Sequence, residues 1–269
     1  MSGAIEFDPT LYRGTAGDYD CFRVPYPQSL FDHLVSLVKP SGRGRLMDLA
    51  CGTGQITFAL ADRFAEAWAV DQEQDMIDLV ANKATGSDHV RAIAAPAEEL
   101  DAPSSTFELV AIGNAFHRLR REAVAANTYR WLQPNGHIAL LWSTGPWTGN
   151  ADWQRAMSEV LERWRTKLGA EARVPAGWDR VRRERPDTEV LDAAGFDAAN
   201  SARFPTPHAW TADALIGFVY STSALPRAVV GARSREFERD LRRGLDGYAT
   251  GGKLVETIDF ACEVARRPA

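Results

Sequence analysis

Residues 45–54 read Arg-Leu-Met-Asp-Leu-Ala-Cys-Gly-Thr-Gly, and an amphipathic run begins at Gln55. The pattern predicts a short strand, an acidic turn, a glycine loop and the start of a helix. Gly52 and Gly54 let the backbone approach a ligand closely, and the helix would point free N–H groups and its positive dipole end at an anionic group. A nucleotide-like ligand is therefore expected at this loop.

The loop differs from one that holds a pyrophosphate dinucleotide. That ligand favours Gly-x-Gly-x-x-Gly, but the third glycine position holds Thr57, and the Asp48 carboxylate would repel a pyrophosphate. The site better suits a ligand with an amino-acid portion, whose carboxylate would face backbone amides and whose ammonium would face acidic or carbonyl oxygens.

The stretch Asp-Leu-Ala-Cys-Gly-Thr-Gly at 48–54 resembles the cofactor loop of class I S-adenosylmethionine-dependent methyltransferases. It is close in pattern to the small-molecule group that includes methyltransferase type 11 and ubiquinone-biosynthesis-type enzymes, and the resemblance covers residues 40–145 well. It implies S-adenosylmethionine as the cofactor. Its loop ligands would be Asp48, Ala50, Gly52, Thr53 and Gly54.

Two further motifs follow the loop in the order typical of these enzymes. The pair Val70-Asp71 ends an apolar run, and a carboxylate about twenty residues past a glycine loop is the usual ribose ligand. The resemblance makes Asp71 the acceptor for both ribose hydroxyls and places Gln72 and Met76 around the adenine. It also implies that residues 95–100 line the adenine edge through Ala97 and Glu98, with Pro96 where an aspartate is usual.

The segment 107–117 resembles the fourth strand and the loop that leads from it toward the acceptor. His117 is the only histidine that a motif places at this edge; it would accept a proton from a hydroxyl or carbon acceptor, or only shape the pocket. Phe116 would pack on the methionine chain or the acceptor, or belong to the core. Asn114, a polar residue ending an apolar strand, is expected to contact cofactor or acceptor.

Residues 1–26 are rich in Tyr, Gly, Asp and Pro without a sustained period, which predicts an ordered arm rather than a helix. The segment resembles the N-terminal lid of the same group. The resemblance suggests that Tyr19 caps the cofactor carboxylate and that Tyr12 walls the acceptor pocket. The alternative is that both rings only pack against the sheet.

Short apolar runs alternate with helix-length segments after the arm. Strands are expected near residues 45–49, 66–71, 90–94, 107–112 and 137–142, and helices near 27–39, 55–64, 74–83 and 121–132. This alternation predicts an α/β, Rossmann-like, doubly wound and mostly parallel sheet covered on both faces. Further along, we expect a helix from Pro186 to Ala194, a strand from Phe196, helices near 211–222 and 234–245, and a last strand near 253–265. The resemblance implies seven strands, the last antiparallel beside the fifth.

Residues 144–186 interrupt this rhythm and predict a helical cap. A helix from Asp152 to Leu168 carries Trp153, Met157 and Trp164 on one side, which would face the acceptor or simply cover the sheet. The whole chain, residues 1–269, is interpreted as one methyltransferase domain. Its parts are a lid arm (1–26), a cofactor-binding core (27–143), the cap insertion (144–186) and a C-terminal part (187–269).

Composition limits the other possibilities. With 269 residues, 45% of them apolar, the chain can bury one substantial core, and its net charge of −5 argues against a nucleic-acid partner. Three scattered cysteines indicate neither a disulfide framework nor a metal site. No apolar run of membrane-spanning length and no secretory leader is expected, which fits a cytoplasmic protein.

These features favour methylation of nitrogen or oxygen on a small, bulky, partly aromatic or sugar-containing metabolite, in secondary metabolism such as antibiotic biosynthesis. A nicotinamide oxidoreductase is disfavoured by Thr57 and Asp48. A protein that uses the cofactor only as a scaffold for binding or a non-transfer reaction stays open. A macromolecular methyltransferase also stays open, although residues 114–117 lack the prolines of base-modifying enzymes. The acceptor, the methylated atom and the oligomeric state, a homo-oligomer included, are not determined.

Overall fold

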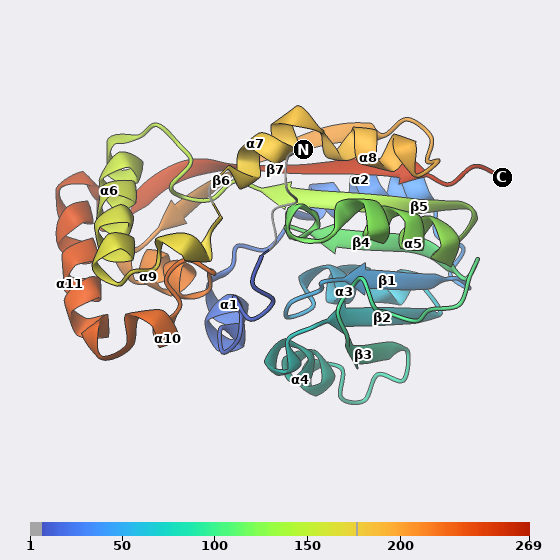
Figure 1. Cartoon of the computed structure of the whole chain (residues 1–269), viewed down its shortest axis with the longest axis horizontal. Coiled ribbons are helices and arrows are strands. Elements are labelled where there is room, and N and C mark those ends of the chain that lie inside the picture. The colour runs from blue at the N-terminus through green and yellow to red at the C-terminus, as the bar shows by residue number, and fades with distance from the viewer. Residues whose placement is uncertain (1–6, 176) are drawn as a thin grey trace. The chain divides into compact units, whose positions relative to one another are not determined.

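The computed structural model describes residues 7–175 and 177–269, and these contain a seven-stranded sheet in the order β3-β2-β1-β4-β5-β7-β6 (Figure 1). The strands are β1 Arg45–Leu49, β2 Glu66–Asp71, β3 Val90–Ala94, β4 Phe107–Gly113, β5 Leu132–Ser143, β6 Asn200–Trp210 and β7 Leu254–Arg266. Strands β1 to β5 pair in parallel, and β7 pairs antiparallel with β5. The predicted Rossmann-like α/β fold, with its last strand reversed beside the fifth, is confirmed.

The chain folds into two compact units, each assembled from three separate segments. The first, which we call the core unit, contains Pro25–Ser143, Gly177–Phe204 and Phe260–Ala269. The second, the helical unit, contains the described residues of Met1–Val24, Thr144–Ala176 and Pro205–Asp259. Two of the five boundaries between the units fall within β6 and β7.

Helices cover both faces of the sheet in the core unit. They are α2 Gln28–Val38, α3 Gln55–Leu60, α4 Gln74–Lys83, α5 Arg121–Trp131, α7 Trp178–Glu184 and α8 Asp187–Ala193. On β1, Asp48 bonds to α3, whereas Met47 and Leu49 belong to the same apolar cluster as Val124 of α5. Successive residues of a strand point to opposite faces, so α3 and α5 lie on opposite faces.

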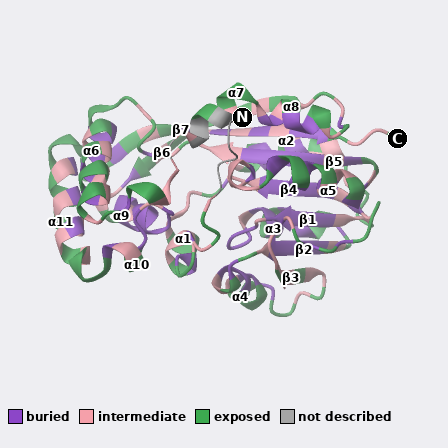
Figure 2. Cartoon of the chain, viewed as in Figure 1, coloured by how far each residue is buried: buried purple, intermediate pink, exposed green. Residues whose placement is uncertain are grey.

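The central strands are buried almost throughout, as the purple ribbons of Figure 2 show. Parallel strands with helices on both faces are expected to be apolar along their whole length, because neither face meets water. Arg45 at the start of β1 is partly exposed, whereas the strand's other charged residue, Asp48, is fully buried. A charge in such a position is costly unless it has a function or a partner.

The helical unit contains α1 Ala16–Phe22, α6 Asp152–Lys167, α9 Ala212–Tyr220, α10 Arg227–Val230 and α11 Ser234–Leu245. Helix α6 packs against α11, where the rings of Trp164 and Phe237 meet edge-on at 5.4 Å. Trp153 and Met157 are also buried, and the Trp153 indole N–H donates to Val255 O. The aromatic side of α6 therefore helps to build the unit's own core, an arrangement that differs from both alternatives considered for it, facing the acceptor and covering the sheet.

Three local predictions differ from the structure. The arm contains a helix, α1, because its residues pack against α9, a contact that local composition does not reveal. The helix expected at 55–64 ends at Leu60 and continues as a single 3-10 turn, Ala61–Arg63. The strand expected from Phe196 begins at Asn200, because Phe196 packs in the core against the Tyr129 ring.

Candidate functional site

Asp48 lies at the carboxyl end of β1, against the first turn of α3. Its Oδ2 accepts hydrogen bonds from the Thr57 backbone N–H at 2.8 Å and from the Thr57 hydroxyl at 2.6 Å. The first N–H groups of a helix have no partner within the helix, so this carboxylate satisfies one of them. Thr57, which stands where a dinucleotide-binding loop would have its third glycine, thus anchors the acidic residue of the loop. The signal available in the sequence was a hydroxyl in the first helical turn after a buried carboxylate.

The second oxygen of Asp48, Oδ1, is buried and has no hydrogen-bond partner among the described residues. Burial raises the pKa of the Asp48 carboxyl to about 7; the hydrogen bonds from Thr57 oppose the rise, and the nearby Asp71 charge adds to it. A cationic group beside Oδ1 would restore the ionised form. This carboxylate therefore fits the ammonium of an amino-acid ligand.

The loop after Asp48 has an unusual backbone. Ala50, Gly52 and Gly54 all have positive φ, at 57°, 54° and 83°. Glycine adopts this region freely, whereas the same conformation costs Ala50 about 1 kcal/mol. A side chain at Gly54 would also meet the Phe58 ring at 2.7 Å. With the Thr53 side chain fully buried, the loop presents mainly backbone, as a closely bound ligand requires.

Asp71 joins the second predicted motif to this loop. Its Oδ2 accepts a hydrogen bond from Gly52 N–H at 2.8 Å, and its Oδ1 accepts one from Glu73 N–H at 3.0 Å. The contact arises because β1 and β2 are parallel neighbours whose carboxyl ends meet at one edge of the sheet. Burial raises the pKa of Asp71, and the two backbone hydrogen bonds oppose that rise. Each carboxylate oxygen keeps a second lone pair for a ligand.

The residues expected around the adenine lie in three different settings. Met76 is buried in α4 and Ala97 is buried after β3, whereas Gln72 is exposed. The Glu98 carboxylate accepts a hydrogen bond from Arg120 N–H at 2.8 Å, just before α5. Glu98 therefore fixes the start of that helix, and its contact with an adenine stays a prediction.

Asn114 follows β4 with a positive φ of 53°. Its side-chain amide donates to the Tyr26 hydroxyl at 3.0 Å and to the Ser143 hydroxyl at 2.9 Å, and its Oδ1 accepts from Ser143 N–H at 2.9 Å. The side chain thus ties the end of β4 to the end of β5 and to the segment before α2. Tyr26 and Ser143 were not predicted, because only the tertiary structure brings them to Asn114.

Phe116 and His117 form part of a 3-10 turn after β4, but their surroundings differ. Phe116 is fully buried in the apolar cluster of the sheet, which favours the core alternative; its contact with the methionine chain or the acceptor stays a prediction. The His117 ring lies 5.6 Å from the Trp142 ring at the end of β5. Burial and the charges of Arg118, Arg182 and Arg121 hold the pKa of His117 well below its usual range. Its imidazole is neutral and weakly basic.

Tyr12 and Tyr19 belong to the helical unit. Their rings meet edge-on at 6.3 Å, and the Arg23 guanidinium lies over the Tyr19 ring at 4.5 Å. Contacts of these two tyrosines with cofactor or acceptor stay predictions.

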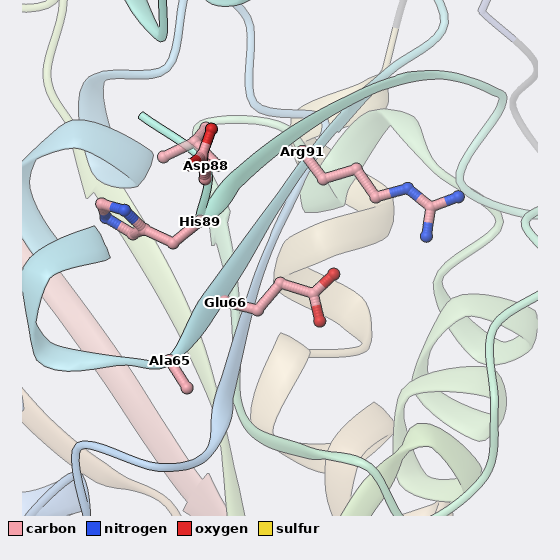
Figure 3. Close-up of a pocket in the computed structure, with 6 residues that line it drawn as sticks. Ala65, Glu66, Asp88, His89 and Arg91 are labelled. Atoms are coloured by element: carbon pink, nitrogen blue, oxygen red, sulfur yellow. The ribbon is translucent and has the colours of Figure 1, made fainter. Parts of the chain in front are cut away.

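A hollow of about 590 Å³ lies at the amino ends of β2 and β3, lined by Ala65, Glu66, Asp88, His89, Val90 and Arg91 (Figure 3). The glycine loop follows β1, and Asp71 ends β2, so both lie at the opposite, carboxyl edge of these parallel strands, and the hollow is not the cofactor site. Across residues 7–175 and 177–269, no helix has the length and apolar character needed to cross a membrane.

Comparisons with known proteins agree with this geometry. Residues 46–136 match a family described as a methyltransferase domain. An uncharacterised methyltransferase of Mycobacterium tuberculosis is 28% identical over 157 residues, 58% of this chain and 61% of the relative, so the match spans less than two thirds of that protein. Nocamycin O-methyltransferase of Saccharothrix syringae is 26% identical over 94% of this chain and 96% of its own length.

Solved structures show the same fold. A putative type II methyltransferase of Anaeromyxobacter dehalogenans is 20% identical, with a TM-score of 0.62 over 92% of this chain and 99% of that one. Phosphoethanolamine N-methyltransferase 2 of Haemonchus contortus, solved with S-adenosyl-L-methionine, is 14% identical, with a TM-score of 0.55 over 99% of this chain and 61% of that one. The match over residues 46–136 thus identifies a methyltransferase domain, and together with the sheet order and the glycine loop bonded to Asp71 it supports a class I S-adenosylmethionine-dependent methyltransferase with S-adenosylmethionine as cofactor.

Proposed function

We propose that this chain transfers the methyl group of S-adenosylmethionine to nitrogen or oxygen of a small, bulky metabolite in secondary metabolism. The observation that carries the proposal is the connected site in which Gly52 N–H bonds to Asp71 while Asp48 keeps a buried oxygen beside the same loop. The name of the Saccharothrix relative, an O-methyltransferase of nocamycin, supports an acceptor of this kind.

Each cofactor residue has a role that follows from its chemistry. Asp48 Oδ1 would accept from the ammonium group, and the loop backbone of Gly52 and Gly54 would approach the amino-acid portion. Asp71 would accept hydrogen bonds from the ribose hydroxyls, and Met76 would pack against the adenine. The bound cofactor supplies an activated methyl group, so the protein has mainly to hold the acceptor in line and exclude water.

Calorimetry with S-adenosylmethionine, its demethylated product, NAD and NADP tests the first part of the proposal. We expect micromolar affinity for the first two, about 8 kcal/mol of binding free energy, and none comparable for the dinucleotides. Incubation with labelled cofactor and an extract of candidate acceptors, followed by identification of the product that gained a methyl group, tests transfer. Tight cofactor binding with no methylated product from any acceptor would favour the scaffold alternative.

Asp71→Ala should weaken cofactor binding by about 1.5 to 3 kcal/mol, because the variant loses charge-assisted hydrogen bonds to a partly buried ligand. Asp78→Ala, an exposed change on α4, is the matched control. Asp71→Asn keeps one acceptor oxygen and should bind with intermediate affinity. Thermal denaturation of each variant separates lost binding from lost folding. An unchanged dissociation constant in Asp71→Ala would place the ribose elsewhere.

A further inference from the structure

Three side chains from different elements of the core unit gather at the carboxyl ends of β4 and β5. Trp142 is the next-to-last residue of β5, and the His117 ring lies 5.6 Å from its ring at an angle of 41°. The guanidinium of Arg182, on α7, lies over the Trp142 ring at only 3.5 Å from its centre. A guanidinium stacked this closely on an indole is held in a defined plane.

A buried carboxylate fixes the orientation of that guanidinium. Asp187, at the start of α8, is 2% exposed; its Oδ2 accepts from Arg182 Nε at 2.7 Å, and its Oδ1 accepts from Arg121 Nη1 at 2.9 Å. Arg121 also donates to Arg185 O at 2.9 Å. The Asp187 bond engages Arg182 through Nε, one of the five N–H donors of its guanidinium.

The balance of charge around His117 is positive. The cations that act on it are Arg118, Arg121 and Arg182, and their fields add to burial in lowering the pKa of His117. The opposing groups are Asp187, which both arginines share, and Glu263 of β7, whose pKa burial raises. In the part of the chain that the structure describes, Trp142 Nε1 and Glu263 Oε2 are buried without a hydrogen-bond partner.

We infer that the Arg182–Trp142–His117 group receives the acceptor as an oxyanion, namely a carboxylate, phenolate or enolate, and that the enzyme therefore methylates oxygen. This inference rests on the proposed function. The guanidinium stacked on Trp142 supplies charge and donors for a planar anion, and the indole supplies a flat apolar surface beside them. An amine acceptor would have to become a cation among three arginines, which the local field opposes.

The reaction of an oxyanion balances without a base. The acceptor oxygen forms a bond to the methyl carbon as the bond between that carbon and sulfur breaks, and the sulfur keeps the electron pair. The negative charge on oxygen and the positive charge on sulfur disappear together, so no proton has to be removed. A neutral, weakly basic His117 then lines the acceptor pocket and does not accept a proton.

Binding of two probes of similar shape and opposite charge tests the inference without requiring turnover. In the protein loaded with S-adenosylhomocysteine, 1-naphthoate and 1-naphthylmethylammonium are titrated while ring nitrogen signals of the histidines are followed by NMR. His117→Asn identifies the His117 signal. We expect naphthoate to shift this signal and to raise the pKa of His117, because a bound anion stabilises imidazolium, and we expect the ammonium probe to leave it unchanged.

Substitutions assign the effect to Arg182. Arg182→Gln should weaken naphthoate binding by about tenfold or more, and Arg182→Lys, which keeps the charge, should recover part of the loss. The control is Arg185→Gln, because Arg185 pairs on the surface with Glu122 and should change binding by less than about twofold. The lysine variant keeps the test valid if the glutamine variant folds poorly.

The inference is overturned if the ammonium probe binds as tightly as naphthoate, if neither probe moves the His117 signal, or if Arg182→Gln and Arg182→Lys bind naphthoate like the wild type. Failure of the proposed function has a different signature. In that case S-adenosylmethionine does not bind, or no acceptor is methylated, whatever the naphthoate titration shows.

Discussion

Asp48 should make the stability of the fold depend on pH in a recognisable way. The pKa of its carboxyl rises from 3.8 to about 7 on folding, so the folded state holds its proton more tightly than the unfolded state. The free energy of unfolding should therefore fall as pH rises from about 4 to about 7, by up to about 4 kcal/mol, and should level off above that range.

Urea denaturation of the wild type and Asp48→Asn across this pH range measures the effect. The variant has no carboxyl to titrate at this position. The difference in unfolding free energy between the two proteins should therefore change with pH by the amount that Asp48 contributes. Parallel pH profiles would show that Asp48 is not perturbed. S-adenosylmethionine should also bind more tightly as pH rises through this range, because the ionised carboxylate faces its ammonium group.

His117→Asn should reduce the rate of methyl transfer by less than about tenfold, whereas loss of a general base typically costs about 10² to 10⁴. The reason is that burial and the neighbouring arginines hold the pKa of His117 well below its usual range, which leaves it a poor proton acceptor. The measurement is the rate constant against pH for both proteins, once an acceptor is known. A larger loss, with a pH inflection that only the wild type shows, would make His117 a base.

At the scale of elements, the contact between α1 and α9 explains why the arm is ordered. A Cβ at Gly217 of α9 would lie 2.3 Å from the Phe22 ring, so the two helices meet where α9 has no side chain. Arg23 strengthens the contact by donating to the Ser221 hydroxyl at 2.9 Å and to Ser221 O at 3.0 Å. The ion pair of Asp18 with Arg227 at 2.7 Å links α1 to α10 as well.

Gly217→Ala should therefore destabilise the protein by about 1 to 3 kcal/mol, the usual cost of overpacking a close contact. Gly17→Ala in α1 is the matched control: a Cβ there meets nothing within 4 Å. It should stabilise the protein by about 0.5 to 1 kcal/mol through helix propensity. Thermal or urea denaturation gives both values. Equal stability of the two variants would mean that Phe22 moves aside without cost.

At the scale of the whole molecule, the predicted cofactor ligands divide between the two units. Asp48 and Asp71 belong to the core unit, whereas Tyr12 and Tyr19 belong to the helical unit. If the arm acts as a lid, adding S-adenosylhomocysteine should slow amide hydrogen exchange around residues 48–54 and also in residues 7–24. Exchange mass spectrometry makes the comparison. Protection confined to the core unit would leave the arm a packing element only.

Short stretches of this sequence were enough to predict its cofactor loop and most of its sheet. The glycine loop, the acidic residue before it and the carboxylate of Asp71 were predicted because backbone conformation and strand–loop–helix order depend on residues close together in the chain. The alternation of apolar runs predicted the sheet for the same reason, although β5 begins at Leu132 and not near residue 137, and β6 begins at Asn200 and not at Phe196. The family resemblance added the reversed last strand.

Tertiary structure decided which side chains meet. Arg121 and Asp187 lie 66 positions apart, Asn114 and Tyr26 lie 88 apart, and Arg227 pairs with Asp18 across 209 residues. Such pairs depend on how whole elements pack, and no local pattern encodes them. The same holds for Phe116, whose place in the core follows from the helices that cover it. The sequence by itself thus determined the cofactor loop and the sheet, while packing alone decided the environment of His117, because burial and distant charges set its basicity.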